Sequence, residues 1–190
     1  MPKRVDPTER RTLIADALMR VAAERGLEAV SLRHVAAEAG ATTGLVQHYF
    51  GTKDEMMLFA LEVVSGHTEA RIGAAVTALG PSPAPRDLVR AMVTQMLPLD
   101  DARRADGKVA LAFFAYAATR PEVAEVQRRG SLGLRDFFAT LMPYAAATTL
   151  LALVEGLGLY LLSGTYTVED GLRVLDEYLD SVFSPAAGRP

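Results

Sequence analysis

Residues 31–53 read SLRHVAAEAGATTGLVQHYFGTK and contain two short apolar runs at helical spacing, each followed by a glycine. Ser31 is suited to cap a first helix, which Gly40 ends after about two turns. A second helix begins near Thr42 and ends at Gly51. Two short helices joined by a glycine-containing turn are typical of a helix-turn-helix, whose second helix lies in the major groove of DNA. The stretch therefore predicts a helical DNA-binding motif.

The second helix and the start of the next one carry groups that suit contact with DNA. These groups belong to Thr42, Thr43, Gly44, Gln47, His48, Tyr49 and Lys53. Hydroxyls and backbone N–H groups at a helix N-terminus favour phosphate, and a glutamine can make the paired hydrogen bonds that suit adenine. A lysine at a helix start is unfavourable by about 0.3–1 kcal/mol, and a DNA phosphate would offset that cost. The alternative is a pair of helices that only packs, with Tyr49 and Phe50 in the core.

Period 3.6 recurs along the rest of the chain without sustained alternation, so the expected fold class is all-α. Cap and stop residues predict about nine helices. The first begins at Asp6-Pro7-Thr8-Glu9 and ends at Gly26, and Thr52 and Glu55 predict a full capping box at the start of the fourth, which runs to about Leu79. GPSPAP, residues 80–85, is expected to be a loop. The fifth helix is expected through Leu88, Met92 and Met96 and is limited by Pro98, and the sixth is expected through Val109, Phe113 and Tyr116. The seventh is expected from Pro121 to Pro143, and the last two over residues 144–163 and 168–182.

Composition and charge limit the class of protein. The chain has 190 residues, half of them hydrophobic, which fits one large or two small globular domains. It has no cysteine, so disulfides, thiolate metal sites and cysteine nucleophiles are excluded. The net charge is −3, but residues 1–53 carry eight Lys or Arg against six Asp or Glu. This asymmetry permits a polyanionic partner at the N-terminal end.

The sequence predicts a soluble, cytoplasmic protein without a membrane partner. The N-terminal residues are polar and show no secretory signal. The longest apolar run, residues 149–162, is interrupted by Glu155 and is shorter than the roughly 20 residues that span a bilayer.

Sequence motifs of catalysis are missing, and we expect a protein that is not an enzyme and binds neither cofactor nor metal. The three histidines, His34, His48 and His67, do not have the spacing of a metal site. The chain contains no GxSxG, P-loop or GxGxxG motif.

The stretch from Asp16 to Leu61 resembles the N-terminal DNA-binding domain of the TetR family of bacterial transcriptional regulators. The resemblance is carried by the Ser-Leu-Arg-x-Val-Ala opening at 31–36, the Ala39-Gly40 turn, the apolar-x-x-His-Tyr-Phe pattern that closes at Phe50, and Lys53. The runs 44–50 and 155–157 are similar to the branch that includes the choline-pathway repressor.

The resemblance implies a ligand-responsive regulator, most often a repressor, that binds a palindromic operator as a homodimer formed through the last two helices. An effector held by the C-terminal domain would shift the fourth helix and release the DNA. The implied domains are 1–53, for DNA binding, and 54–190, for effector binding and dimerisation. By position, the operator would face Arg33, Thr43, Gly44, Gln47, His48 and Tyr49, with Lys53 on a phosphate.

A small-molecule pocket in residues 54–190 needs apolar walls and a few polar groups. Met92, Met96, Phe113 and Tyr116 are candidates for the walls, and Gln95 and Glu155 for the polar groups. Methionine and aromatic residues at helical spacing also fit ordinary core packing. A carboxylate inside an apolar run is costly unless it is paired or exposed, so Glu155 indicates either a cationic effector or the edge of the dimer interface.

One alternative function belongs to the same fold class. A helix-turn-helix protein can bind DNA architecturally, as nucleoid-associated proteins do, without any effector. Stabilisation by a small molecule separates the two alternatives, because an architectural protein would show none.

Overall fold

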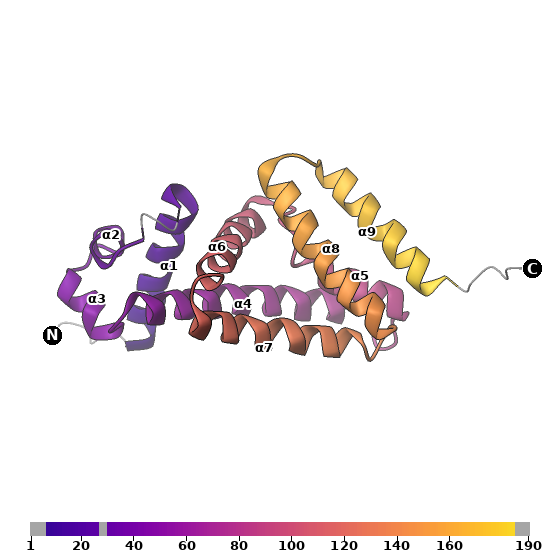
Figure 1. Cartoon of the computed structure of the whole chain (residues 1–190), viewed down its shortest axis with the longest axis horizontal. Helices are drawn as coiled ribbons and strands as arrows, with labels where there is room; N and C mark the ends of the chain where they lie inside the picture. Colours follow the sequence, from indigo (N-terminus) through magenta and orange to yellow (C-terminus); the bar gives the residue numbers. More distant parts are fainter. Residues whose placement is uncertain (1–6, 27–29, 185–190) are drawn as a thin grey trace, which may run out of the picture. The chain divides into compact units, whose positions relative to one another are not determined.

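The computed structural model describes residues 7–26 and 30–184, and over these residues the chain forms nine α-helices (Figure 1). The helices are α1 (Pro7–Arg25), α2 (Leu32–Glu38), α3 (Thr43–Tyr49), α4 (Lys53–Ala78), α5 (Pro85–Thr94), α6 (Asp101–Ala117), α7 (Pro121–Phe138), α8 (Tyr144–Ser163) and α9 (Val168–Phe183). The prediction of an all-α chain of about nine helices is confirmed for this part of the chain.

Several helix ends differ from the sequence prediction. Pro85 belongs to α5 rather than to the loop, because proline fits the first helical position. α5 ends at Thr94 and α7 at Phe138, each before the proline that was expected to end it. The predicted cap Asp6 lies outside the described residues.

The helices gather into two compact units. The first contains the described residues up to His67 together with Lys108–Ala124, and the second contains Thr68–Gly107 and the described residues from Glu125 onward. The helix-turn-helix thus shares a unit with the first part of α4, the second part of α6 and the start of α7. The predicted domain boundary after residue 53 stays a prediction.

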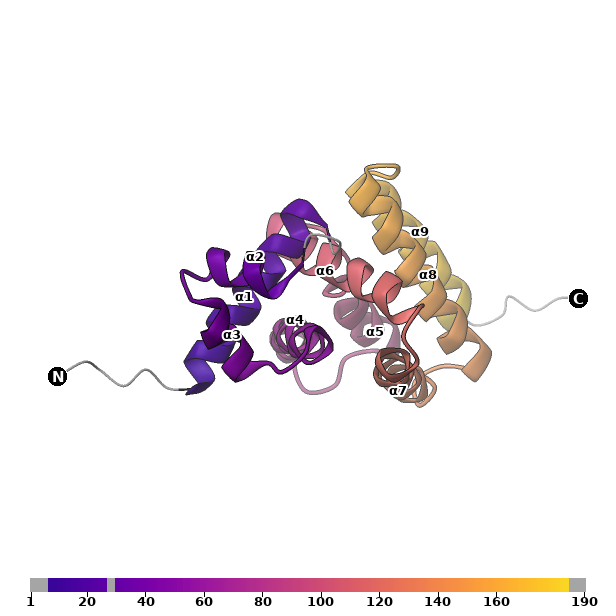
Figure 2. The same cartoon turned by 60° about the vertical axis from the view of Figure 1, so that its left-hand side comes forward.

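The first unit has one apolar core that supports α2 and α3. α2 packs against both α1 and α3 (Figure 2). The fully buried members of the core include Ile14 and Leu18 from α1, Val35 from α2, and Val46 and Phe50 at α3. Further buried residues come from α4, α6 and α7: Met56, Met57, Ala60, Val64, Val109, Phe113, Ala117 and Val123. Both helices of the motif are therefore anchored by one face each, which leaves the other face of α3 to solvent.

The second unit is built around α8 and α9, which lie side by side and antiparallel (Figure 1). Gly171 of α9 is buried against Leu161 of α8, and the hydroxyl of Tyr178 donates a hydrogen bond to the carbonyl of Ala146 at 2.6 Å. The core also takes in residues from α5, α7 and the segments that follow them: Val89, Met92, Val93, Leu97, Phe138 and Met142. The helix pair is thus joined by close packing and by a hydrogen bond.

The sequence prediction that the apolar run 149–162 is too short to span a bilayer is corrected by the length of α8. The helix has 20 residues with a mean hydropathy of 1.7, so within the described residues one helix is long and apolar enough to cross a membrane. The core helix of a soluble protein passes the same test of length and composition. Only 28% of its apolar window is buried within the chain, and the buried residues recur at helical spacing on one side: Ala147, Leu150, Val154, Leu157 and Leu161. The opposite side of α8 remains uncovered in a single chain.

Candidate functional site

The two helices of the motif are closed by the caps that the sequence predicts. The Ser31 hydroxyl accepts a hydrogen bond from the backbone N–H of His34 at 3.2 Å, and the Thr42 hydroxyl accepts one from Leu45 at 3.2 Å. Between them Gly40 has φ +61°, a conformation that side chains other than glycine rarely adopt. These contacts fix a sharp turn between α2 and α3 without using the outward face of α3.

α3 presents its polar residues outward. Val46 is fully buried, whereas Gln47 and His48 beside it are exposed. Tyr49 is half-buried against the core, and its ring meets that of His48 edge-on with centroids 5.3 Å apart. Thr42, Thr43 and Gly44 are exposed at the N-terminus of the helix. These six predicted DNA-contact positions therefore lie together on one short helix and its cap.

The junction between α3 and α4 differs in one bond from the predicted capping box. Thr52 accepts from the backbone N–H of Glu55 at 3.1 Å, as expected. The carboxylate of Glu55 accepts from the backbone N–H of Gly51 at 2.8 Å rather than from that of Thr52. The prediction of a reciprocal bond to Thr52 is therefore wrong, because the carboxylate reaches one residue further back. The bond ties the end of α3 to the first turn of α4.

Lys53, the first residue of α4, lies beside a polar cluster that the sequence did not predict. Its ammonium is 5.6 Å from the centre of the Tyr116 ring, and the Tyr116 hydroxyl donates a hydrogen bond to Asp54. The guanidinium of Arg120 lies 4.3 Å from the same ring centre and 3.7 Å from the Asp54 carboxylate. Burial and the bond to Asp54 raise the pKa of Tyr116 to about 12. The cluster fixes the first turn of α4 against the end of α6.

Arg33 lies on α2 and is exposed. α2 is held to α1 by an ion pair in which the Arg20 guanidinium donates to the Glu38 carboxylate at 2.7 Å. The orientation of α2, and with it the position of Arg33, therefore depends on α1 as well as on the turn to α3.

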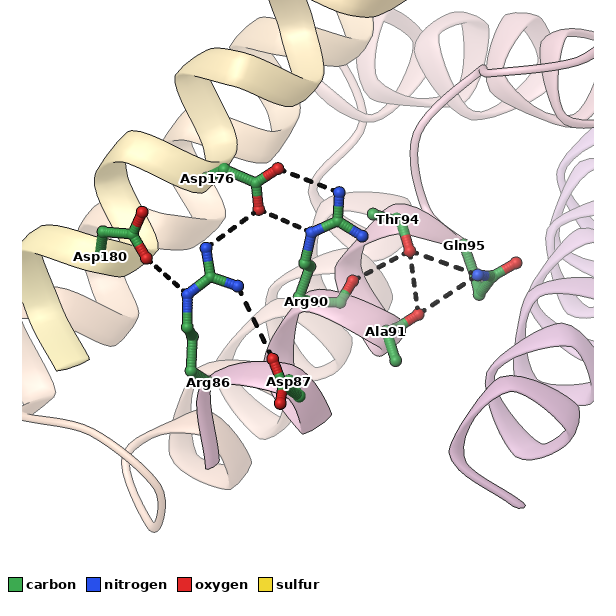
Figure 3. Close-up of polar contacts among 8 residues, drawn as sticks. All are labelled: Arg86, Asp87, Arg90, Ala91, Thr94, Gln95, Asp176 and Asp180. Carbon is green, nitrogen blue, oxygen red and sulfur yellow. Dashed lines mark hydrogen bonds and ion pairs between the residues drawn. The ribbon is translucent and has the colours of Figure 1, made fainter. Parts of the chain in front are cut away.

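The six residues predicted for an effector pocket are divided between the two units. Phe113 is fully buried in the first core, and Tyr116 belongs to the cluster at Asp54. Met92 and Met96 pack in the second core. Gln95 caps the C-terminus of α5, where its amide donates to the carbonyl of Ala91 and the hydroxyl of Thr94, both at 3.3 Å (Figure 3). Their assignment to a pocket stays a prediction.

Glu155 lies in the middle of α8. Its side chain is exposed, and it has no hydrogen bond or ion pair within the described part of the chain. Desolvation by the surrounding protein nevertheless raises the pKa of Glu155 above its ordinary value. The carboxylate is thus exposed but only partly hydrated, and no cationic side chain among the described residues compensates for the lost hydration.

The Tyr116–Asp54 contact and the bond from Gly51 to Glu55 were missed by sequence reasoning for different reasons. Tyr116 and Asp54 are 62 residues apart, and no pattern in the sequence relates them. Glu55 was correctly assigned to the cap region, and only its partner was wrong.

Comparison with known proteins covers nearly the whole chain. Residues 14–59 match the model of bacterial regulatory proteins of the tetR family, and residues 85–184 match that of the C-terminal domain of BetI-type transcriptional repressors. The regulator PksA of Bacillus subtilis is 33% identical, over 96% of this chain and 94% of the relative.

Solved structures agree with this assignment. A transcriptional regulator from Rhodococcus sp. Rha1 has a TM-score of 0.84 and 35% identity, covering 95% of this chain and 99% of that one. The multidrug binding protein EbrR, solved with ethidium, has a TM-score of 0.69 and 25% identity, covering 90% of this chain and 98% of that one. The chain therefore belongs to the TetR family of bacterial transcriptional regulators.

Proposed function

We propose that the protein is an effector-responsive repressor that acts in the cytoplasm. It binds a palindromic operator as a homodimer through residues 1–53 and is released when residues 54–190 take up a small molecule. The observation that carries the proposal is the outward face of α3, where Gln47 and His48 are exposed beside the buried anchor Val46. The function is regulatory rather than catalytic.

The DNA contacts divide into two kinds. Gln47 is assigned to a base edge, because its amide can donate and accept to one adenine in the major groove. Arg33, His48, Tyr49 and the capped N-terminus at Thr42 to Gly44 surround it as contacts to phosphates or to neighbouring bases. Because the Thr42 cap and the core already fix α3, the exposed side chains of Gln47 and His48 are available for recognition.

Lys53 is assigned to a phosphate. Its charge lies at the N-terminus of α4, where the helix dipole makes a cation unfavourable by about 0.3–1 kcal/mol. Its neighbours Tyr116 and Asp54 hold the backbone of this turn, and the charge of the nearby Arg120 is offset by its ion pair with Asp54. An anionic DNA strand next to this turn would be attracted by Lys53.

The homodimer is assigned to α8 and α9. α8 buries one side in its own core and leaves an outward side of small and apolar residues: Ala145, Thr148, Thr149, Ala152, Gly156 and Leu159. An uncovered apolar helix face of this length is a mark of an interaction site, and a self-complementary contact of two helix pairs closes into a dimer with twofold symmetry. Such a dimer presents two α3 helices to two half-sites.

The effector is assigned to the second domain, with Glu155 as a counter-charge for an organic cation. A partly desolvated carboxylate without a cationic partner gains most from a ligand that brings one. Ethidium, which EbrR holds in its solved structure, is an organic cation. Met92, Gln95 and Met96, which belong to the same unit as Glu155, are the other residues proposed to contact the effector. Phe113 and Tyr116 are not included, because they are held in the core and the Asp54 cluster of the first unit.

The test of DNA binding is selection of bound fragments from the source genome. The expected fragments share an inverted repeat whose half-site centres are about one helical turn of DNA apart, or a multiple of it. Bound fragments without a shared sequence would overturn specific recognition and favour architectural binding.

The test of effector control begins without DNA, by screening organic cations for thermal stabilisation of the protein. A compound that stabilises the protein is then expected to lower its affinity for the selected fragment, because an effector must bind the two conformations unequally. If every stabilising compound leaves operator affinity unchanged, effector release is wrong. Repression itself is tested by deleting the gene, which should raise transcription beside the selected site.

A further inference from the structure

α5 and α9 are joined by a group of charged side chains that the proposed function does not use (Figure 3). The guanidinium of Arg90 donates two hydrogen bonds to the Asp176 carboxylate, at 2.6 and 3.0 Å. Arg86 donates to Asp180 at 2.6 Å and to Asp176 at 3.3 Å. We call these four residues the α5–α9 clamp. Asp176 is its centre, because it accepts from both arginines.

The clamp matches the two helices turn for turn. Arg86 and Arg90 are four residues apart and so lie one turn from each other on the same face of α5, as Asp176 and Asp180 do on α9. Because the helices run antiparallel at this contact, the first arginine meets the last aspartate. A slip of α9 by one turn would leave one guanidinium and one carboxylate without a partner. The pattern therefore specifies a single register.

The ionic states in the clamp are fixed by its hydrogen bonds. The bonds from Arg90 hold the pKa of Asp176 below its ordinary value, and the bond to Asp180 raises the pKa of Arg86. The side chains are partly exposed, and exposed ion pairs contribute little to stability. A forked arginine–carboxylate pair, however, is strongly directional. The clamp is thus better suited to positioning a helix than to holding the fold together.

We propose that the α5–α9 clamp positions α9 for dimerisation, so that Arg86 and Arg90 of α5 control the interface without lying in it. This inference rests on the proposed homodimer through α8 and α9. An interface made of two helices from each chain requires that α9 keep one register against its neighbours. Packing at Gly171 fixes α9 where it begins, and the clamp fixes its second half.

The test measures the dimer dissociation constant by sedimentation equilibrium, well below the unfolding temperature. Arg90→Gln and Asp176→Asn are each expected to raise this constant about tenfold or more, a change of about 1.4 kcal/mol. The dissociation constant of the double variant is expected to be no higher than the higher of the two single-variant constants, because both changes remove the same interaction. The matched control is Arg128→Gln, which removes an exposed ion pair within α7, outside the proposed interface, and should leave the constant unchanged.

Two further measurements separate positioning from damage to the fold. Arg90→Lys keeps the charge but removes the fork, so the dimer should weaken while the circular dichroism of the helices is unchanged. In the wild-type protein, raising the salt concentration from about 0.1 to about 1 M should weaken the dimer, because salt screens the clamp. An apolar interface without the clamp would not respond in this direction.

The outcomes distinguish the clamp from the proposed function. A dimeric wild type whose clamp variants dissociate like the control would overturn the clamp and leave the homodimer standing. Additive effects of the two single variants would also overturn it. A wild type that is monomeric at all concentrations would overturn the homodimer itself, and the role of the clamp with it.

Discussion

A Cβ atom added to Gly171 of α9 would lie 3.1 Å from Cδ2 of Leu161 of α8. Real Cβ contacts are rarely this short, and Leu161 is itself fully buried with little freedom to move. The two helices thus approach each other at the one position on α9 where no side chain separates them.

Gly171→Ala is therefore expected to destabilise the protein by about 1 kcal/mol, because overpacking costs about 1–3 kcal/mol and exceeds the gain in helix propensity. Urea unfolding measures the change. Gly130→Ala is the control, since its Cβ meets nothing within 4 Å in the middle of α7, and it should stabilise by about 0.5–1 kcal/mol. Equal stabilisation by both variants would show that Leu161 yields.

Gln47→Ala is expected to relax sequence preference at one or two operator positions, at a cost of about 1–3 kcal/mol for the preferred site. Selection from a randomised operator library measures the preference. Gln127→Ala on α7 is the control for the loss of a glutamine elsewhere. An unchanged sequence preference would show that Gln47 does not contact a base edge.

Lys53→Ala is expected to weaken binding to all DNA sequences alike and to reduce the salt dependence of the affinity by about one unit of slope. Affinity measured over a range of salt concentrations gives the slope. Lys108→Ala removes an exposed lysine of the same unit and should leave it unchanged. A slope that stays the same in Lys53→Ala argues against the phosphate contact.

Tyr116→Phe tests the cluster at the start of α4. The folded-state pKa of Tyr116, about 12, lies above the ordinary value of about 10. Its contribution to stability is therefore present below pH 10 and is lost as the pH rises toward 12. Ultraviolet titration of the wild type should show one tyrosine that ionises near pH 12, and Tyr116→Phe should lack this step. Tyr166→Phe, an exposed control, should keep it.

Glu155→Gln tests the desolvated carboxylate. Because its pKa is raised in the folded state, the charged form is unfavourable there, and the loss of stability grows as the pH rises above the ordinary value. The variant should unfold at a higher temperature than the wild type at pH 7.5, and the difference should vanish near pH 4. Glu122→Gln on α7 is the control. Ethidium fluorescence, measured without DNA, should report weaker binding to Glu155→Gln if the carboxylate faces the effector.

The sequence predicted the elements whose signals are local. Caps and stops act within four residues, so Ser31, Gly40 and Thr42 located α2 and α3 correctly. Helical spacing also placed Val46 on the buried side of α3. Contacts between distant segments could not be predicted this way. Arg90 and Asp176 are 86 residues apart, and each alone fits a solvated helix face. Tyr116 was assigned to a pocket because aromatic spacing does not reveal the partner of a hydroxyl.

The construction of α3 has a consequence for how such a protein changes over generations. Its N-terminus is capped by Thr42, the carboxylate of Glu55 accepts from Gly51 just after its C-terminus, and its inner side is held by Val46 and Phe50. Gln47 takes part in neither the caps nor the buried core, and its exposed side chain can be exchanged at little cost in stability. Under the proposed function, mutation at this position would redirect the regulator to other operators while the fold and the residues of the proposed effector and dimer sites are kept.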